Sequence, residues 1–364
     1  MTVNEIHPCK TIGVVIPVGP SNASFEIFIE EYRRSIAASS AAIETAIIFN
    51  NISLSRISQL QSLVPNNFRK KDLGSCSHGI SKARNAGIRL LGDDVDYILF
   101  LDDDDLLRSD ALSRLPRHLE DGLDIIVYGW SSKDKATGRK KIFDLPRTGS
   151  YPARRALSDD LVTYLTIPRE MPYLGYVWGK AFSTKLIASN KLFFNEAIST
   201  NEDVLFLMQA MFSADGISYV NEVLVIYGFI DKKDADKASF AEHDIKIASG
   251  FVEVARYLRS ITSSFQGLPE TRMHRLLTRY VGYIFYFSLL RCLKGTNLGE
   301  LRRQYRNSMA LINTIDDEFC QRKYFVVPAT GESLLIGWLN KLRWFRLAFG
   351  VCLVKTFLER KYDS

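Results

Sequence analysis

The chain has 364 residues, of which 46% are hydrophobic, 12% aromatic and 24% charged, a composition that excludes a low-complexity or disordered protein. The length predicts about two domains of roughly 150 residues each. The net charge of +6 is uneven: residues 251–364 hold 18 basic and 9 acidic residues, and residues 1–250 hold 29 and 32. The basic C-terminal third indicates an anionic partner, either membrane lipid or nucleic acid. Since no nucleic-acid-binding module is recognisable, we do not expect nucleic acid.

The cysteines are five in number and show no Cys-x-x-Cys or Cys/His metal spacing, which predicts reduced thiols of a cytosolic protein. They are Cys9, Cys76, Cys292, Cys320 and Cys352. The first ten residues lack the apolar segment of a secretory signal. No apolar run reaches the ~18–20 residues that a membrane-spanning helix needs. We therefore expect a cytoplasmic protein that does not span a membrane.

The first part of the chain alternates β-rich apolar runs with segments whose apolar residues recur three and four positions apart. In chain order, the pattern predicts a strand over 10–18, a helix over 24–41, a strand over 44–49, a helix over 53–63, a polar loop over 71–79, a helix over 80–91 and a strand over 97–101. This order is typical of a doubly wound α/β sheet.

The next predicted elements are a helix over 109–119, a strand over 123–128, a hairpin or irregular segment over 131–172, a helix-like stretch from 178, a helix over 204–212 and a strand over 219–229. A charged segment over 231–237 marks the expected domain boundary. The helical pattern returns over 240–264, 268–294, 297–315 and 333–360.

The strand over 97–101 ends in four consecutive aspartates, Asp102 to Asp105. Its apolar run is typical of a strand buried on both faces. The aspartates repel one another and have poor strand and helix propensity, so we place them in the loop that follows. Ligands of open α/β sheets bind beyond the carboxyl ends of the strands, and clustered carboxylates there suit a divalent cation bound with a phosphorylated ligand. A solvated acidic turn is the alternative.

Several motifs follow one another in a fixed order: a first strand ending in Ile16-Pro17, then A-R-N-A-G over 83–87, F-L-D-D-D-D over 100–105, W-G-K over 178–180 and Glu202-Asp203. Together they resemble the family 2 glycosyltransferases with the GT-A fold, and the resemblance covers about residues 10–230. It implies an α/β catalytic domain with a doubly wound mixed sheet over 1–232. A basic, mostly helical domain over 233–364 is expected to follow.

The resemblance also implies roles for single residues. A nucleotide-sugar donor is expected to contact Pro17, Val18, Asn50, Arg84, Asp102 and Asp103. Asp104 is the expected ligand of Mn²⁺ or Mg²⁺, since these cations prefer carboxylate oxygens. Asp203 is the expected base that takes the proton of the acceptor hydroxyl, with Glu202 beside it. Asn85 and Lys82 are expected either to assist at the donor or to be solvated helix residues. Asp105 is expected either to support the residues that contact donor and metal or to cap the next helix.

Trp178 is the expected acceptor-side ring, with a buried core position as the alternative. For Glu202-Asp203, the alternative is a charged first turn of a helix.

Two departures from the family pattern concern the ligands. The second strand ends in Asn50-Asn51 instead of an acidic residue, which leaves the base of the donor, expected to be uracil, open. Tyr227-Gly228 stands where many relatives have Tyr-Arg.

These features predict an inverting, metal-dependent transferase that acts on a saccharide or lipid-linked saccharide in surface polysaccharide synthesis. A degenerate domain that binds glycans or serves as a scaffold is one alternative. A nucleotidyltransferase is another, although the Gly-rich loop it needs near the N-terminus is missing.

The segment over 333–360 combines Trp338, Trp344 and Phe345 with Lys341 and Arg343. This composition is typical of an interfacial helix on an anionic membrane. Its polar positions do not fall on one face, so a helix buried in a bundle or a homodimer is the alternative. An interfacial helix would place the protein peripherally on the inner face of the cytoplasmic membrane.

Overall fold

The computed structural model describes residues 10–20, 25–75, 79–119, 122–134, 137–166, 172–229, 250 and 252–261. The chain divides into two compact units, of which the first comprises residues 1–157, 173–197 and 206–231 and the second the rest. Residues 252–260 are helical, inside the predicted helix over 240–264. The five cysteines and the predicted helices beyond 261 lie outside the described residues. The predicted domain boundary at 232 therefore stays a prediction.

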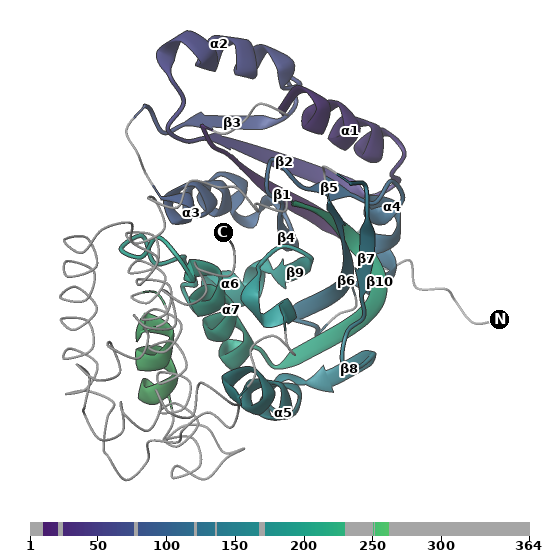
Figure 1. The fold of residues 1–364 in the computed structure, drawn as a ribbon, viewed down its shortest axis with the longest axis vertical. Helices are drawn as coiled ribbons and strands as arrows, with labels where there is room; N and C mark the ends of the chain where they lie inside the picture. Colours follow the sequence, from purple (N-terminus) through teal and green to yellow (C-terminus); the bar gives the residue numbers. More distant parts are fainter. Residues whose placement is uncertain are drawn as a thin grey trace, which may run out of the picture. The chain divides into compact units, whose positions relative to one another are not determined.

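The first unit begins with the predicted alternation of strands and helices (Figure 1). Its elements are β1 (Thr11–Val18), α1 (Phe25–Ala37), β2 (Ala42–Phe49), α2 (Leu54–Leu63), β3 (Arg69–Asp72), α3 (Ile80–Leu91), the 3₁₀ helix η1 (Gly92–Asp94) and β4 (Tyr97–Phe100). The one difference is β3, whose charged sequence predicted a loop from residue 71. It forms a strand because it pairs in parallel with β2, with Arg69 opposite Ala46.

The elements that follow depart more from the prediction. They are β5 (Leu106–Leu107), α4 (Ala111–Arg114), the 3₁₀ helix η2 (Leu115–His118), β6 (Ile125–Asp134), β7 (Lys140–Phe143), β8 (Gly149–Pro152), α5 (Ala153–Thr166), the 3₁₀ helix η4 (Pro172–Gly175), β9 (Lys180–Ser183), α6 (Thr184–Ser189), α7 (Glu202–Ser213) and β10 (Gly216–Phe229).

The hairpin predicted within 131–172 is present, since β7 pairs in antiparallel fashion with β6. The same segment also contains the helix α5, which the sequence pattern missed. The stretch from residue 178 does not begin as a helix: Gly179 has a φ of +72°, in the left-handed region that does not continue a right-handed helix, and the strand β9 starts at Lys180. The helix α6 follows only at Thr184.

The strands form one mixed sheet in the order β3-β2-β1-β4-β9-β6-β10-β5, with β7 beside β6 and β8 beside β10. The strands β1 to β4 pair in parallel, whereas β9 is antiparallel to both of its neighbours. The predicted mixed α/β sheet is thus confirmed. The chain moves outward from β1 to β3 and then returns to β4 on the other side of β1. Such a reversal of strand order creates a crevice at the carboxyl ends of the two strands.

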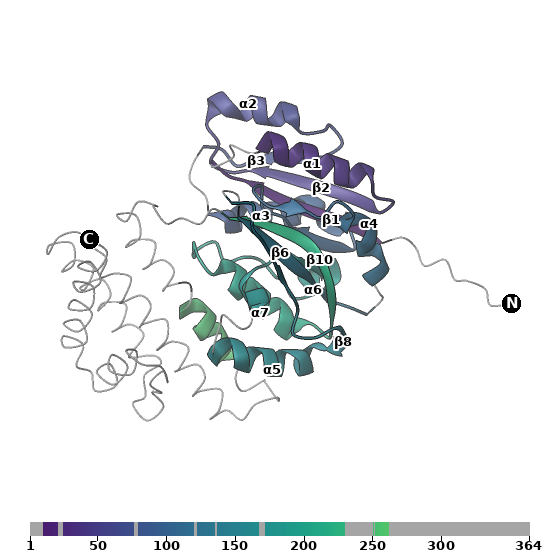
Figure 2. The ribbon, with the colours of Figure 1, turned by 45° about the vertical axis from the view of Figure 1, so that its right-hand side comes forward.

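The helix α3 packs closely against β1 and β2, on the side opposite to α1 and α2 (Figure 2). A Cβ atom on Gly87 would lie 2.3 Å from Cγ1 of Val15 in β1, so only glycine fits there. Ala83 and Ala86 pack on the fully buried Ile48 of β2. The small residues of the A-R-N-A-G motif thus bring the helix backbone onto the sheet.

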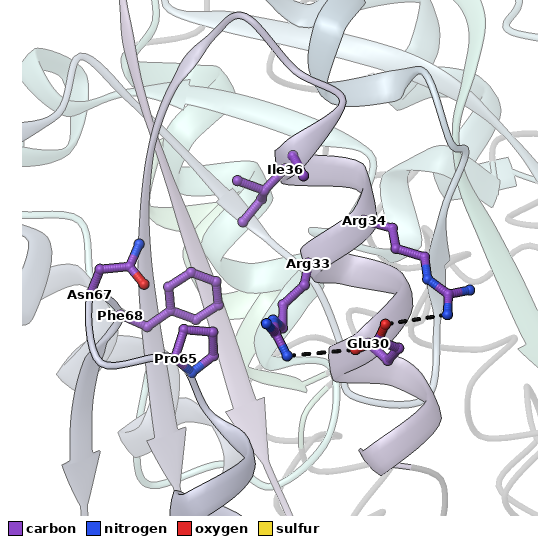
Figure 3. Close-up of a pocket in the computed structure, with 8 residues that line it drawn as sticks. Glu30, Arg33, Arg34, Ile36, Pro65, Asn67 and Phe68 are labelled. Carbon is purple, nitrogen blue, oxygen red and sulfur yellow. Dashed lines mark ion pairs between the residues drawn. The ribbon is translucent and has the colours of Figure 1, made fainter.

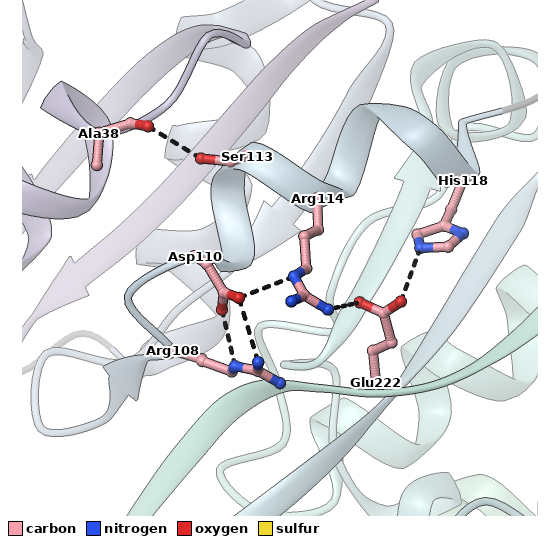
Figure 4. Close-up of polar contacts among 7 residues, drawn as sticks. All are labelled: Ala38, Arg108, Asp110, Ser113, Arg114, His118 and Glu222. Carbon is pink, nitrogen blue, oxygen red and sulfur yellow. Dashed lines mark hydrogen bonds and ion pairs between the residues drawn. The ribbon is translucent and has the colours of Figure 1, made fainter.

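A network of charged residues joins α4 to β10 (Figure 4). Nε of Arg108 and Nε of Arg114 lie 2.7 and 2.8 Å from the two carboxylate oxygens of Asp110. Arg114 also pairs with Glu222, at 3.1 Å from Nη1 to Oε2. Glu222 lies 3.7 Å from Nε2 of His118. This network stabilises the packing of the elements that follow the acidic loop.

Within the described ranges, no helix is long and apolar enough to cross a membrane. A groove of about 350 Å³ lies between α1 and the loop over 65–68 (Figure 3). Its arginines, Arg33 and Arg34, both pair with Glu30. None of the aspartates after β4 lines this groove.

Candidate functional site

The loop that carries the four aspartates lies where the strand order reverses. It forms a tight turn, in which the backbone N–H of Asp105 donates to the carbonyl oxygen of Asp102 at 3.2 Å. The N–H of Gly19, just after β1, donates to Oδ2 of Asp103 at 3.3 Å. Burial and the neighbouring charge of Asp104 raise the pKa of Asp103 to about 7. Asp104 is exposed. The loop thus spans the carboxyl ends of β1 and β4.

Arg84 of α3 is directed at this loop. Its side chain is only 2% exposed, and its Nη2 donates to Oδ1 of Asp102 at 3.0 Å. Its guanidinium also lies 5.3 Å from the ring centroid of Phe194, within the range of a cation–π contact. In this arrangement Arg84 orients the carboxylate of Asp102. Its contact with a donor stays a prediction.

Asp105 does not cap the next helix. It is fully buried, and its Oδ1 accepts a hydrogen bond from the N–H of Gly228 in β10 at 3.0 Å. The next residues form β5, in which Leu106 pairs with Ile226, and the next helix starts only at Ala111. The predicted helix cap was therefore wrong, because pairing with β10 takes up the chain directly after Asp105.

The predicted donor residues at the ends of β1 and β2 lie at the same edge of the sheet. Pro17 and Val18 pair with the last residues of β2. The N–H of the buried Asn50 donates to the carbonyl oxygen of Val18 at 2.9 Å. Asn51 follows with a φ of +59°, a conformation that asparagine tolerates better than most residues. The structure therefore brings these residues to the edge of the sheet where Asp102 and Asp103 also lie.

A cluster of aromatic rings adjoins the acidic loop. The ring centroid of Trp178 lies 4.6 Å from that of Tyr176, 5.6 Å from that of Tyr227 and 5.8 Å from that of Trp130. Trp178 is 4% exposed, whereas Tyr176 is 37% exposed. Burial, then the nearby Tyr176 and the aspartates of the loop, raise the pKa of Tyr227. A stacking role for Trp178 stays a prediction, and Tyr176 is the accessible ring of the cluster.

Sequence reasoning missed Tyr176, which belongs to no family motif. Its backbone is held by Lys180, whose buried Nζ donates to the carbonyl oxygen of Tyr176 at 2.6 Å. The only sequence feature that could have indicated a role for Tyr176 is its position two residues before the W-G-K motif. The lysine of this motif therefore supports the aromatic cluster.

Asn85, expected either to assist at the donor or to be a solvated helix residue, is buried and clamps a distant loop, so the prediction of a solvated residue was wrong. Its amide donates to the carbonyl oxygen of Phe194 and to Oε1 of Glu196, both at 2.9 Å, and it accepts from the N–H of Phe194 at 2.8 Å. Asn85 is 1% exposed. Since Phe194 covers the guanidinium of Arg84, the clamp also supports the pair of Arg84 and Asp102.

We expect Asn85→Ala to lower the free energy of unfolding by about 1–3 kcal/mol, because it leaves buried backbone groups of Phe194 without their partner. Urea denaturation measures the change. Lys82→Ala, on the same helix and more exposed, serves as the control. Equal urea midpoints for the two variants would contradict the clamp.

Glu202 and Asp203 form the first turn of α7, the position named above as the alternative, where the helix dipole stabilises negative charge. Glu202 is 9% exposed and Asp203 is half-buried. Both belong to the second compact unit. Their action on a substrate held by the acidic loop stays a prediction.

The described residues contain no group of three or more His, Cys, Asp or Glu side chains that could hold a metal ion by themselves. Magnesium-type sites commonly use only one or two carboxylates, together with waters and the phosphates of the substrate. The exposed Asp104 and the partly exposed Asp102 fit that kind of site. Burial and then the charge of Asp104 raise the pKa of Asp103, and a bound cation would offset the repulsion between these carboxylates.

Comparison with known proteins finds a family likeness for part of the chain. The model of glycosyl transferase family 2 matches residues 59–172, which include Arg84 and the acidic loop. The chain is 24% identical over 153 residues to EpsH of Bacillus subtilis, which bears the name of a glycosyltransferase. It is 23% identical over 280 residues, or 76% of its length, to the poly(ribitol-phosphate) beta-N-acetylglucosaminyltransferase TarS of Staphylococcus aureus. The chain spans 42% of the length of each of these relatives.

Solved structures share the fold. The crystal structure of TarS 1–349 superposes with a TM-score of 0.59 at 16% identity, covering 97% of this chain and 92% of that one. The same protein with UDP and with UDP-GlcNAc gives the same TM-score. The likeness confirms the predicted fold.

Proposed function

We propose, from the premise that this chain belongs to glycosyltransferase family 2 and has the GT-A fold, that it transfers a sugar from a nucleotide-sugar donor to a hydroxyl group of a saccharide acceptor. The observation that carries this proposal is the acidic loop at the reversal of strand order, with Asp102 held by Arg84 and Asp104 exposed. A diphosphate carries negative charge that carboxylates alone repel, so the loop suits a donor bound together with a cation.

The proposed donor is a UDP-sugar. The TarS complexes with UDP and UDP-GlcNAc support this choice, as does the buried Asn50 at the edge of the crevice. An amide side chain can both donate and accept hydrogen bonds, as recognition of a uracil edge requires. Pro17, Val18 and Asp103 complete the proposed donor contacts.

We assign Mn²⁺ or Mg²⁺ to Asp104, where the metal would stabilise the negative charge of the departing nucleotide. Arg84 contributes by holding Asp102 in one orientation, which lowers the cost of ordering that side chain when the donor binds.

The proposed transfer inverts the configuration of the anomeric carbon. Asp203 takes the proton of the acceptor hydroxyl as its oxygen attacks from the face opposite the leaving nucleotide, and Glu202 stands beside it. The acceptor is a saccharide or lipid-linked saccharide of a surface polysaccharide, in keeping with the polymer named for TarS. The proposal includes a cytoplasmic location, with the segment over 333–360 either on the inner face of the membrane or in a homodimer.

The test is the release of UDP from UDP-sugars by the wild type in Mn²⁺ and in EDTA. We expect EDTA and Asp104→Asn each to lower turnover about 10²–10³-fold, since removing one group that stabilises transition-state charge typically costs this much. Asp93→Asn, an equally conservative change at an exposed aspartate of η1, should keep full activity. Full activity of Asp104→Asn would refute the metal assignment.

A domain that binds glycans without transferring sugar is the second candidate, because Asn50 stands where relatives have an acidic residue. Calorimetry with UDP-, GDP- and CDP-sugars in Mn²⁺ separates the two functions. Binding of none of these donors would favour the second candidate.

A further inference from the structure

The hairpin of β6 and β7 carries a concentration of positive charge. Residues 133–141 contain five basic residues and one acidic residue. Lys133, Lys140 and Lys141 are all exposed. In the antiparallel register Lys133 lies opposite Lys140, and Ser132 lies opposite Lys141. We call the described residues 130–134 and 137–143 the basic hairpin.

The basic hairpin adjoins the candidate donor site through the strand β10. Since β6 is parallel to β10 and antiparallel to β9, its carboxyl end lies at the same edge of the sheet as that of β4. Tyr227 is in register with Ser132, and Gly228 with Lys133. The N–H of Gly228 donates to the acidic loop at Asp105. One strand, β10, therefore contacts both the acidic loop and the hairpin.

One face of the hairpin continues the aromatic cluster. Trp130 contacts Trp178 and stacks on Phe143, at 4.9 Å between ring centroids and an interplanar angle of 6°. Nζ of Lys141 lies 4.7 Å from the ring centroid of Phe143. Because side chains alternate along a strand, Lys141 shares this face and Lys140 projects from the other.

A row of residues across three strands links the cluster to this lysine. Tyr227 of β10, Ser132 of β6 and Lys141 of β7 are in register. Neighbouring strands lie about 4.8 Å apart, so about 10 Å of sheet separates Tyr227 from Lys141. The row therefore combines an aromatic ring, a hydroxyl group and an exposed ammonium group. Tyr176, the accessible ring of the cluster, stands beside Tyr227 at 6.2 Å between centroids.

We propose that this face is the acceptor subsite and that it takes an anionic acceptor, a saccharide or polyol that carries phosphate. Tyr176 provides the apolar surface for the sugar or polyol carbons. Lys141 donates to a phosphate oxygen as a compact positive charge on a flexible stem. The inference rests on the proposed function and deepens it, because it names the class of acceptor.

The test uses the full chain, and the probes are a ribitol-phosphate octamer and a neutral dextran octamer. Calorimetry at constant ionic strength should show that the phosphate oligomer binds and that Lys141→Gln raises its Kd about tenfold, the cost typical of one charge-assisted hydrogen bond. Lys140→Gln is the matched control, because it removes the same charge from the opposite face of the same hairpin. It should change the Kd less than twofold. Equal thermal unfolding of the two variants verifies the fold.

Several results would overturn the inference. Equal losses in both variants would indicate long-range attraction only, and tighter binding of the neutral oligomer would exclude an anionic acceptor. Aggregation of both variants with unchanged Kd would show that the lysines protect an edge strand.

If Lys141→Gln loses binding to phosphatidylglycerol vesicles but binds the oligomer as the wild type does, Lys141 contacts a membrane instead. Binding of UDP-, GDP- and CDP-sugars in Mn²⁺ is measured by calorimetry in parallel, because binding of none of them refutes the proposed function, whereas the oligomer comparison tests the subsite alone.

Discussion

Replacing Asp203 by asparagine is expected to lower the kcat of sugar transfer about 10²–10⁴-fold, the range that a positioned general base contributes. Asparagine has nearly the same shape as aspartate but cannot take up the proton of the acceptor hydroxyl. Asp203 lies in the first turn of α7, where the dipole of the helix stabilises its charged form. Initial rates of transfer at saturating donor and acceptor measure the effect.

The control for this prediction is Asp215→Asn, the same chemical change at an exposed position just beyond the other end of α7. It should leave kcat within about twofold, because surface substitutions away from a site have small effects. Circular dichroism and thermal unfolding show whether both variants keep the fold. A variant of Asp203 with wild-type kcat would require another base.

Replacing Gly87 by alanine is expected to lower the free energy of unfolding by about 1–3 kcal/mol, the usual cost of overpacking a core. The added Cβ would lie 2.3 Å from Cγ1 of Val15, and both sides of the contact are fixed by the packing of α3 on β1. Chemical denaturation measures the loss. Because α3 also carries Arg84, donor binding should weaken in parallel.

Gly175→Ala is the matched control, since a Cβ at Gly175 meets no atom within 4 Å and its φ is not in the left-handed region. It should change the unfolding free energy by less than about 0.5 kcal/mol. A second check combines Gly87→Ala with Val15→Ala, which removes the methyl groups in conflict. The double variant should lose less stability than the sum of the single variants, and strict additivity would argue against the contact.

Most of the early elements could be predicted because their signals are local. The helix over Ile80–Leu91 and the strand over Tyr97–Phe100 agree with the pattern to within a residue, since apolar spacing specifies which face of a helix or strand is buried. The position of the aspartates after a buried strand follows from the same local signal. The prediction was less accurate over residues 131–172. This segment has a mixed polar composition, so its strands and the helix α5 form according to the neighbouring elements they pack against.

The mixed α/β fold, the family motifs and an acidic loop at a strand end all follow from local features of the sequence. The separate roles of residues in and around that loop depend on contacts that form only in the folded chain. Asp105 is a buried acceptor for Gly228, Asn85 clamps Phe194, and Tyr176 is the accessible ring. The first two contacts join residues 123 and 109 positions apart in the chain. Partners at such separations are chosen by strand order and packing, which local periodicity does not encode.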